Sequence, residues 1–243
     1  MPTVRSKAYG SDENPTIYYL TGYTGTIRKY RPHIYALLLG GFRILAFEYD
    51  TAVLDSGEPS TLIQTLKDIE SAIQKDKEGR EIAGIYGVSL GSWLGLNAMV
   101  ACDLKKGMFN TAGTSIARGV WELPRLKKEK ATYRKHGYDR QDLEKAWGHY
   151  DKIADFSKRL SGAKIVVLNS TTDEIIKIDE ARENIQAWQQ DDLEVELITS
   201  TGLKHGSAIT RHMLRLRKTL RFFKDTKKQK QEVVSYPHSN RRG

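Results

Sequence analysis

The chain contains 243 residues, of which 39% are hydrophobic and 28% charged, and it carries a formal net charge of +9 and a single cysteine. This length is enough for one domain with a substantial core, and no apolar run approaches the ~20 residues of a membrane-spanning helix. One cysteine cannot close an internal disulfide, and the amino end lacks the apolar stretch of a secretory signal, so we expect a cytoplasmic protein.

The first part of the chain alternates predicted strands with predicted helices. In chain order the segments are a strand over 16–20, a helix over 27–39, a strand over 42–49 and an amphipathic helix over 59–75. The loop after the first strand reads Thr21-Gly22-Tyr23-Thr24-Gly25. Glu48, Asp50 and Asp55 lie near the end of the second strand, where acidic side chains are more typical of turns and helix caps than of catalysis.

A serine between two glycines follows the next apolar strand. The segment Gly87-Val88-Ser89-Leu90-Gly91 joins a strand that begins at Ile82 to a helix predicted over 90–102. This spacing is typical of a nucleophile elbow, a sharp strand-to-helix turn that leaves one serine hydroxyl exposed at the rim of a sheet. Ser89 is therefore a candidate nucleophile. Cys102, at the end of this helix, is expected to be a small buried side chain.

A charged stretch over residues 118–160 interrupts the alternation after a strand predicted over 107–112. Aromatic and leucine side chains are spread through it, and two interpretations remain open. These side chains either line a substrate pocket or anchor the stretch to the body of the domain. The residues that we predict for such a pocket are Trp121, Leu123, Leu126, Tyr133 and Trp147.

Two more predicted strands, over 163–169 and 193–199, are each followed by a polar loop. The first loop carries Asp173 and the second carries His205; helices are predicted over 179–190 and 207–223. The carboxyl ends of parallel strands meet at one edge of a sheet, so we expect Ser89, Asp173 and His205 to lie close together there. Glu174 is an alternative acid and His212 an alternative base.

With these residues the chain resembles the α/β-hydrolase family over most of residues 16–224. The order serine, aspartate, histidine is that of the family's triad. The loop over 21–25 is similar to the family's H-G-x-x-G oxyanion loop, with Thr21 in place of the usual histidine. The resemblance implies that the backbone N–H groups of Tyr23 and Leu90 form the oxyanion hole.

The fold class that we expect is α/β. The alternation predicts a mostly parallel sheet with helices on both faces. The family resemblance implies that the first strands are shortened or missing. It also implies a small helical lid over about 118–160. The length fits a single domain over residues 1–224, and the composition predicts a basic tail over 225–243.

The predicted activity is hydrolysis of carboxylic esters with short- to medium-chain acyl groups, through an acyl-enzyme intermediate. Thioesters and lactones use the same machinery, and a non-catalytic binding protein with this fold also remains open. The reaction needs no cofactor. No metal site is expected, because the other histidines have no carboxylate or cysteine at ligand spacing.

The positive charge is concentrated at the carboxyl end. Residues 204–243 hold 12 lysines and arginines against two acidic residues, whereas the remaining 203 residues hold 27 basic and 28 acidic ones. The end of this segment is polar without apolar periodicity, so we expect disorder over 225–243. No nucleic-acid partner is expected, because aromatic residues are not interleaved with the basic ones; a weak contact with anionic surfaces remains open. The sequence does not predict the oligomeric state.

Overall fold

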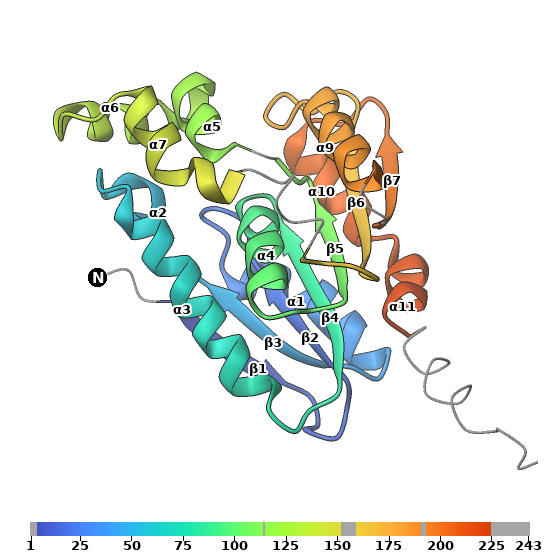
Figure 1. The fold of residues 1–243 in the computed structure, drawn as a ribbon. Helices are drawn as coiled ribbons and strands as arrows, with labels where there is room; N and C mark the ends of the chain where they lie inside the picture. Colours follow the sequence, from blue (N-terminus) through green and yellow to red (C-terminus); the bar gives the residue numbers. More distant parts are fainter. Residues whose placement is uncertain (1–3, 114, 152–158, 191–192, 225–243) are drawn as a thin grey trace, which may run out of the picture.

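The computed structural model describes residues 4–113, 115–151, 159–190 and 193–224 (Figure 1). A seven-stranded sheet in the order β1-β3-β2-β4-β5-β6-β7 forms its centre. β1 pairs with β3 in antiparallel fashion, and every other pair is parallel. The strands are β1 (Arg5–Tyr9), β2 (Thr16–Leu20), β3 (Arg43–Glu48), β4 (Ile82–Val88), β5 (Lys106–Asn110), β6 (Lys164–Ser170) and β7 (Glu194–Ser200).

Helices cover both faces of this sheet. They are α1 (Ile27–Leu39), α2 (Ala52–Asp55), α3 (Ser60–Lys77), α4 (Leu90–Ala101), α5 (Ile116–Glu122), the 3₁₀ turn η1 (Pro124–Leu126), α6 (Lys127–Lys135), α7 (Arg140–Asp151), α9 (Ile178–Gln190), α10 (His205–Met213) and α11 (Leu216–Lys224). Figure 1 shows α3 and α4 in front of the sheet and α1 behind it, with α5, α6 and α7 above the carboxyl ends of the strands. None of the described helices is long and apolar enough to cross a membrane.

Alternate residues of each central strand build two separate cores. Tyr18 and Leu45 pack with the apolar sides of α3 and α4, whereas Tyr19 and Ile44 pack with α1 and α11. Because successive side chains of a strand point to opposite faces, a strand that is buried on both faces must be apolar throughout. This is why the predicted strands read as almost continuous apolar runs.

Two differences between the observed and the predicted elements have a clear physical cause. β1 was not predicted, because most of its residues, among them Arg5 and Lys7, are exposed at the sheet edge and give no apolar run. The helix predicted over 207–223 is two helices, α10 and α11, with Leu214 and Arg215 between them. α10 packs against β5 and β6, whereas α11 packs against β4 and α1, so the chain must change direction between them.

Candidate active site

The turn between β4 and α4 places Ser89 at the carboxyl edge of the sheet. Ser89 has φ 51° and ψ −116°, a left-handed backbone conformation that is strained for any residue with a side chain. The flanking glycines allow the close packing of the turn. A Cβ on Gly91 would lie 2.3 Å from the carbonyl oxygen of Thr21, and one on Gly87 would lie 2.4 Å from that of Gly91. The sequence pattern therefore corresponds to a tight turn with no room for larger side chains.

The structure brings Ser89, His205 and Asp173 into one hydrogen-bonded chain. The Ser89 hydroxyl lies 3.0 Å from Nε2 of His205, and Nδ1 of His205 lies 2.8 Å from Oδ2 of Asp173. The carboxylate can only accept, so it fixes the tautomer with the proton on Nδ1, and Nε2 is left to accept from the serine. Both Asp173 and His205 are buried, at 6% and 4% exposure.

Asp173 is held in its charged form. Burial raises the pKa of this carboxyl, but the hydrogen bond and charge of His205, together with the N–H groups of Ile176 and Ile175, lower it below the usual value. Oδ1 accepts from these two N–H groups at 3.0 and 2.8 Å. Both carboxylate oxygens thus have donors, which is the condition for a buried negative charge.

Glu174, the alternative acid, has a different position. Its Oε2 accepts a hydrogen bond from the backbone N–H of His205 at 3.1 Å. It therefore contacts the main chain of the histidine and not its ring. Glu48 and Asp50 accept in the same way from the N–H groups at the starts of α1 and α2, at Ile27 and Ala52.

His212, the alternative base, lies outside the chain of three residues. It is fully buried, with Nδ1 3.0 Å from Oδ1 of Asn110 and Nε2 3.1 Å from the Ser200 hydroxyl. Burial, with a smaller effect of the Arg215 charge, lowers the pKa of His212 to about 4, so the ring is neutral at pH 7. Both ring nitrogens are occupied by structural partners.

Asn110, at the end of β5, connects the elbow to α10, and the sequence analysis missed it. Its carbonyl oxygen accepts from the backbone N–H of Ser89 at 2.8 Å. Its carboxamide donates to the carbonyl of Ile209 at 3.0 Å and accepts from His212. One residue therefore holds the backbone of the serine and the helix that begins at His205. In the sequence, the sign of this structural role was a polar residue at the end of an otherwise apolar strand.

The proposed oxyanion donors, the backbone N–H groups of Tyr23 and Leu90, have no acceptor among the described residues. The loop that carries Tyr23 is braced without a histidine. The hydroxyl of Tyr49 donates to the carbonyl of Thr21, and the N–H of Gly22 donates to the hydroxyl of Tyr30 at 3.4 Å. Tyrosine side chains from α1 and the end of β3 thus support the loop in which Thr21 replaces the usual histidine.

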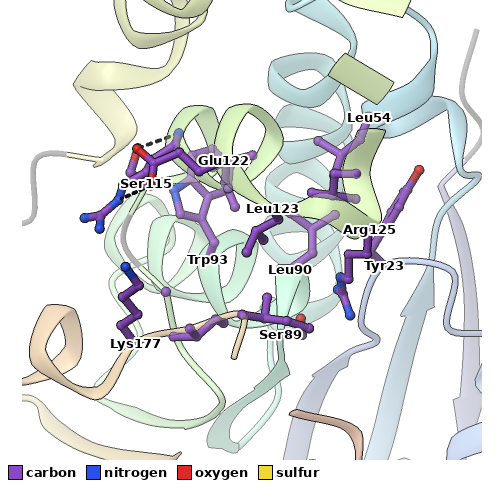
Figure 2. Close-up of a pocket in the computed structure, with 17 residues that line it drawn as sticks. Tyr23, Leu54, Ser89, Leu90, Trp93, Ser115, Glu122, Leu123, Arg125 and Lys177 are labelled. Carbon is purple, nitrogen blue, oxygen red and sulfur yellow. Dashed lines mark hydrogen bonds and ion pairs between the residues drawn. The ribbon is translucent and has the colours of Figure 1, made fainter. Parts of the chain in front are cut away.

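A pocket of about 90 Å³ opens beside Ser89 (Figure 2). Leu123 and Leu126, two of the five predicted pocket residues, line it. Trp93, one turn after the nucleophile on α4, and Arg125, between the two leucines, also line it, and neither was predicted. The apolar part of the wall further includes Leu54, Leu90, Ile116, Ile175 and Ile176.

The other three predicted pocket residues, Trp121, Tyr133 and Trp147, do not line this pocket. Tyr133 and Trp147 are fully buried and pack edge to face, with ring centroids 5.8 Å apart. Nε1 of Trp147 donates to the carbonyl of Pro59 at 2.9 Å, which fastens α7 to the start of α3. The ring of Trp121 lies under the ammonium group of Lys130, 5.1 Å from its centroid. These three aromatics therefore hold the stretch over residues 118–160 in place, because their partners lie in the body of the domain or within the stretch itself.

In the part of the chain that the structure describes, no group of three or more histidine, cysteine or acidic side chains is arranged to hold a metal ion. Cys102 is buried, and burial raises the pKa of its thiol to about 11. A thiol with so high a pKa is protonated and unreactive at neutral pH. The described chemistry at this edge of the sheet is therefore that of the hydroxyl, the imidazole and the carboxylate.

Comparisons with known proteins show the fold. No protein-family model and no curated protein sequence matches the chain. A monoacylglycerol lipase of Paleococcus ferrophilus has a TM-score of 0.63 at 12% identity, over 90% of this chain and 99% of that one. A structure reported with carboxylesterases of Nitrososphaera gargenis has 0.63 at 13%, over 94% and 96%. A puromycin-hydrolysing peptidase of Mycobacterium tuberculosis has 0.70 at 15%, over 97% of this chain and 38% of that one. The chain has the α/β-hydrolase fold.

Proposed function

We propose that this protein is a serine hydrolase that cleaves carboxylic esters with short acyl groups. The observation that carries the proposal is the hydrogen-bonded chain from Ser89 through His205 to Asp173, which ends beside a largely apolar pocket. A serine whose hydroxyl hydrogen-bonds an imidazole that is itself oriented by a carboxylate is the arrangement of an activated nucleophile. Solved structures with the same fold include esterases and lipases.

In the first half of the reaction, Ser89 Oγ attacks the ester carbonyl while Nε2 of His205 takes the hydroxyl proton. The carbonyl oxygen becomes an oxyanion, which the N–H groups of Tyr23 and Leu90 would bind. His205 then gives the proton to the leaving alkoxide, the C–O bond breaks, and an acyl-serine remains. In the second half, His205 takes a proton from water, the hydroxide attacks the acyl group, and Ser89 Oγ leaves with the proton.

Asp173 and the two backbone N–H groups supply electrostatic stabilisation. The lowered pKa of Asp173 keeps it charged at neutral pH, where it stabilises the imidazolium that forms in each half reaction. Each N–H group aimed at the oxyanion contributes about 10²- to 10³-fold in rate. Both N–H groups are free of acceptors among the described residues, so they can take up this role without losing another hydrogen bond.

The size of the pocket favours short acyl groups. Its volume of about 90 Å³ is smaller than the roughly 150 Å³ cavity that holds a benzene molecule. A series of 4-nitrophenyl esters should therefore give the highest kcat/KM at two to four acyl carbons. Thioesters and lactones of the same acyl size would use the same steps, and assaying matched thioesters beside the esters distinguishes these substrate classes.

Labelling with a fluorophosphonate probe tests the proposal directly, because only an activated serine reacts. The wild-type protein should be labelled, and Ser89→Ala should lose both the labelling and about 10⁴-fold or more of kcat. Ser60→Ala, an exposed serine at the start of α3, is the matched control and should be labelled like the wild type. A wild-type protein that reacts neither with the probe nor with any ester would favour the alternative, a non-catalytic binding protein.

A further inference from the structure

Three basic side chains, Arg118, Arg125 and Lys177, and one acidic side chain, Glu122, line the largely apolar pocket beside Ser89. Arg118 is paired, with Nε 3.1 Å from Oε2 of Glu122. Arg125 and Lys177 make no hydrogen bond or ion pair with any residue in the described parts of the chain. The pocket thus holds two cations whose side-chain donors are available to a bound group.

Arg125 lies in the 3₁₀ turn η1, above the site. Figure 2 shows its side chain running toward the Ser89 end of the pocket, while Tyr23 beside it points the other way. The Tyr23 hydroxyl donates to Glu129 on α6 at 2.7 Å. Lys177 lies at the opposite end of the pocket in the same view. Of these two basic groups, Arg125 is therefore the one on the Ser89 side of the pocket.

The acidic groups around Arg125 do not neutralise it. Asp173, Glu174 and Glu129 are close enough to affect it electrostatically, but Arg125 is exposed and its charge remains accessible from the pocket. Each of the three carboxylates already accepts hydrogen bonds elsewhere: Asp173 from His205, Glu174 from the His205 backbone and Glu129 from Tyr23. None of them lies within ion-pair distance of the guanidinium. Arg125 is an exposed residue that lines the pocket, so its guanidinium donors are accessible to an anionic group of a bound substrate.

We propose that Arg125 binds a carboxylate carried by the ester substrate, so that the preferred substrates are short esters with one free carboxylate. This inference rests on the proposed hydrolase function. A guanidinium presents parallel N–H donors that match the two oxygens of a carboxylate. The small pocket favours the planar carboxylate over the bulkier phosphate. Lys177 adds a second, more distant positive charge that favours the same sign of substrate.

Matched pairs of esters test this preference. In one pair the carboxylate is on the acyl side, with monomethyl succinate compared with methyl butyrate. In the other pair it is on the alcohol side, with 4-acetoxybenzoate compared with its methyl ester. The wild-type enzyme should show a kcat/KM ratio of charged to neutral ester above one in at least one pair. The ratio should fall as salt rises from 0.1 M to 1 M, since the screening length falls from about 10 to about 3 Å.

Substitution of Arg125 should change this ratio. Arg125→Gln should lower it roughly tenfold or more, the size of a charge-assisted hydrogen bond, and Arg125→Glu should lower it further. Arg125→Lys should retain part of it, and Lys177→Gln should lower it less than Arg125→Gln. Lys127→Gln is the matched control, because Lys127 is an exposed cation two residues away that does not line the pocket. Its ratio should equal that of the wild type.

The outcomes separate this inference from the proposed function. If neutral esters are hydrolysed and the probe labels Ser89, but neither pair shows a preference that depends on Arg125, the carboxylate site is wrong and the hydrolase function stands. If phosphate-bearing esters show the Arg125-dependent preference instead, the proposed carboxylate is likewise wrong. If neither ester of either pair reacts and Ser89 is not labelled, the function itself fails.

Discussion

Each residue of the proposed triad is held by its main chain as well as by its side chain. The N–H of Ser89 donates to Asn110, and the N–H of His205 donates to Glu174. The N–H of Asp173 donates to the carbonyl of Ser170 at 3.4 Å. Neighbouring carboxylates at 173 and 174 thus have separate functions, one toward the imidazole ring and one toward its backbone.

This division predicts the effects of two conservative substitutions. Asp173→Asn should lower kcat by about 10⁴-fold, because an amide that donates to Nδ1 stabilises the wrong tautomer. Glu174→Gln keeps an oxygen that can accept from the His205 N–H, so kcat should fall less than about tenfold. Steady-state kinetics on one short ester measures both. A larger loss for Glu174→Gln would assign the acid to Glu174.

At the scale of elements, the elbow depends on close approach of α4 to β2. The Cβ of an alanine at Gly91 would meet the backbone oxygens of Thr21 and Leu20 at 2.3 and 2.5 Å. Backbone atoms cannot move aside as flexible side chains can. The helix would have to shift away from the sheet, and Ser89 would shift with it.

Gly91→Ala should therefore destabilise the protein by roughly 1–3 kcal/mol or more and lower its activity. Gly148→Ala is the control, because a Cβ at Gly148 in α7 meets no atom within 4 Å. A glycine-to-alanine change inside a helix stabilises by roughly 0.5–1 kcal/mol when there is space. Urea unfolding of both variants measures these opposite signs. Equal stabilities for the two would contradict the packing argument.

The carboxylate of Asp151, at the end of α7, connects the stretch over residues 118–160 to α4, the helix that follows Ser89. Nε1 of Trp93 donates to Oδ1 of Asp151 at 2.7 Å. Burial raises the pKa of Asp151 from 3.8 to about 6, against the smaller effects of hydrogen bonds from Trp93, Ser115 and the N–H of Ile116. Trp93 lines the pocket, so this contact connects a titratable group to the pocket wall.

The raised pKa gives a pH dependence with a definite sign. The folded protein holds the Asp151 proton more tightly than the unfolded chain, so this stabilising contribution is complete below pH about 4 and is lost as the pH rises through about 6. Urea unfolding should show wild type losing stability relative to Asp151→Asn over this range, by less than about 3 kcal/mol. Asp103→Asn, an exposed aspartate, should show no such difference. A constant difference between wild type and Asp151→Asn would contradict it.

The elements that could be predicted from the sequence are those whose residues lie mainly in the hydrophobic cores. α1 and the central strands have apolar patterns set by the cores, so their limits were predicted to within about two residues. β1 was missed because an exposed edge strand needs no apolar run. The three residues of the proposed triad were found through turn chemistry at strand ends. Asn110 and Arg125 were missed, because their importance depends on contacts between segments far apart in the sequence.

For the whole molecule, charge is separated along the chain. Residues 204–243 carry the entire positive excess, and His205 of the proposed triad lies at the start of this segment. α10, α11 and the two residues between them contribute Arg211, Arg215, Arg217, Lys218, Arg221 and Lys224 to this excess. The basic tail predicted over 225–243 lies outside the described residues.

Deletion of residues 225–243 removes five basic and two acidic side chains, a loss of three positive charges. We expect kcat on a small ester to stay within about threefold of the full chain, because no proposed site residue is removed. Binding to anionic vesicles, if the full chain shows it, should weaken and become less dependent on salt. Ester kinetics and vesicle co-sedimentation at two salt concentrations measure these effects. A collapse of kcat on truncation would show that the tail supports the folded domain.

Asn110 has a consequence for motion within the molecule. Its carbonyl is bonded to the serine backbone and its carboxamide to the helix that starts with the histidine. When the end of β5 is displaced, Ser89 and the helix that carries His205 should therefore move together. The distance between the two residues should then change less than the position of either one. Proton transfer depends on that separation. The connection through Asn110 should therefore keep the distance between the Ser89 hydroxyl and Nε2 of His205 more constant than the positions of the surrounding helices.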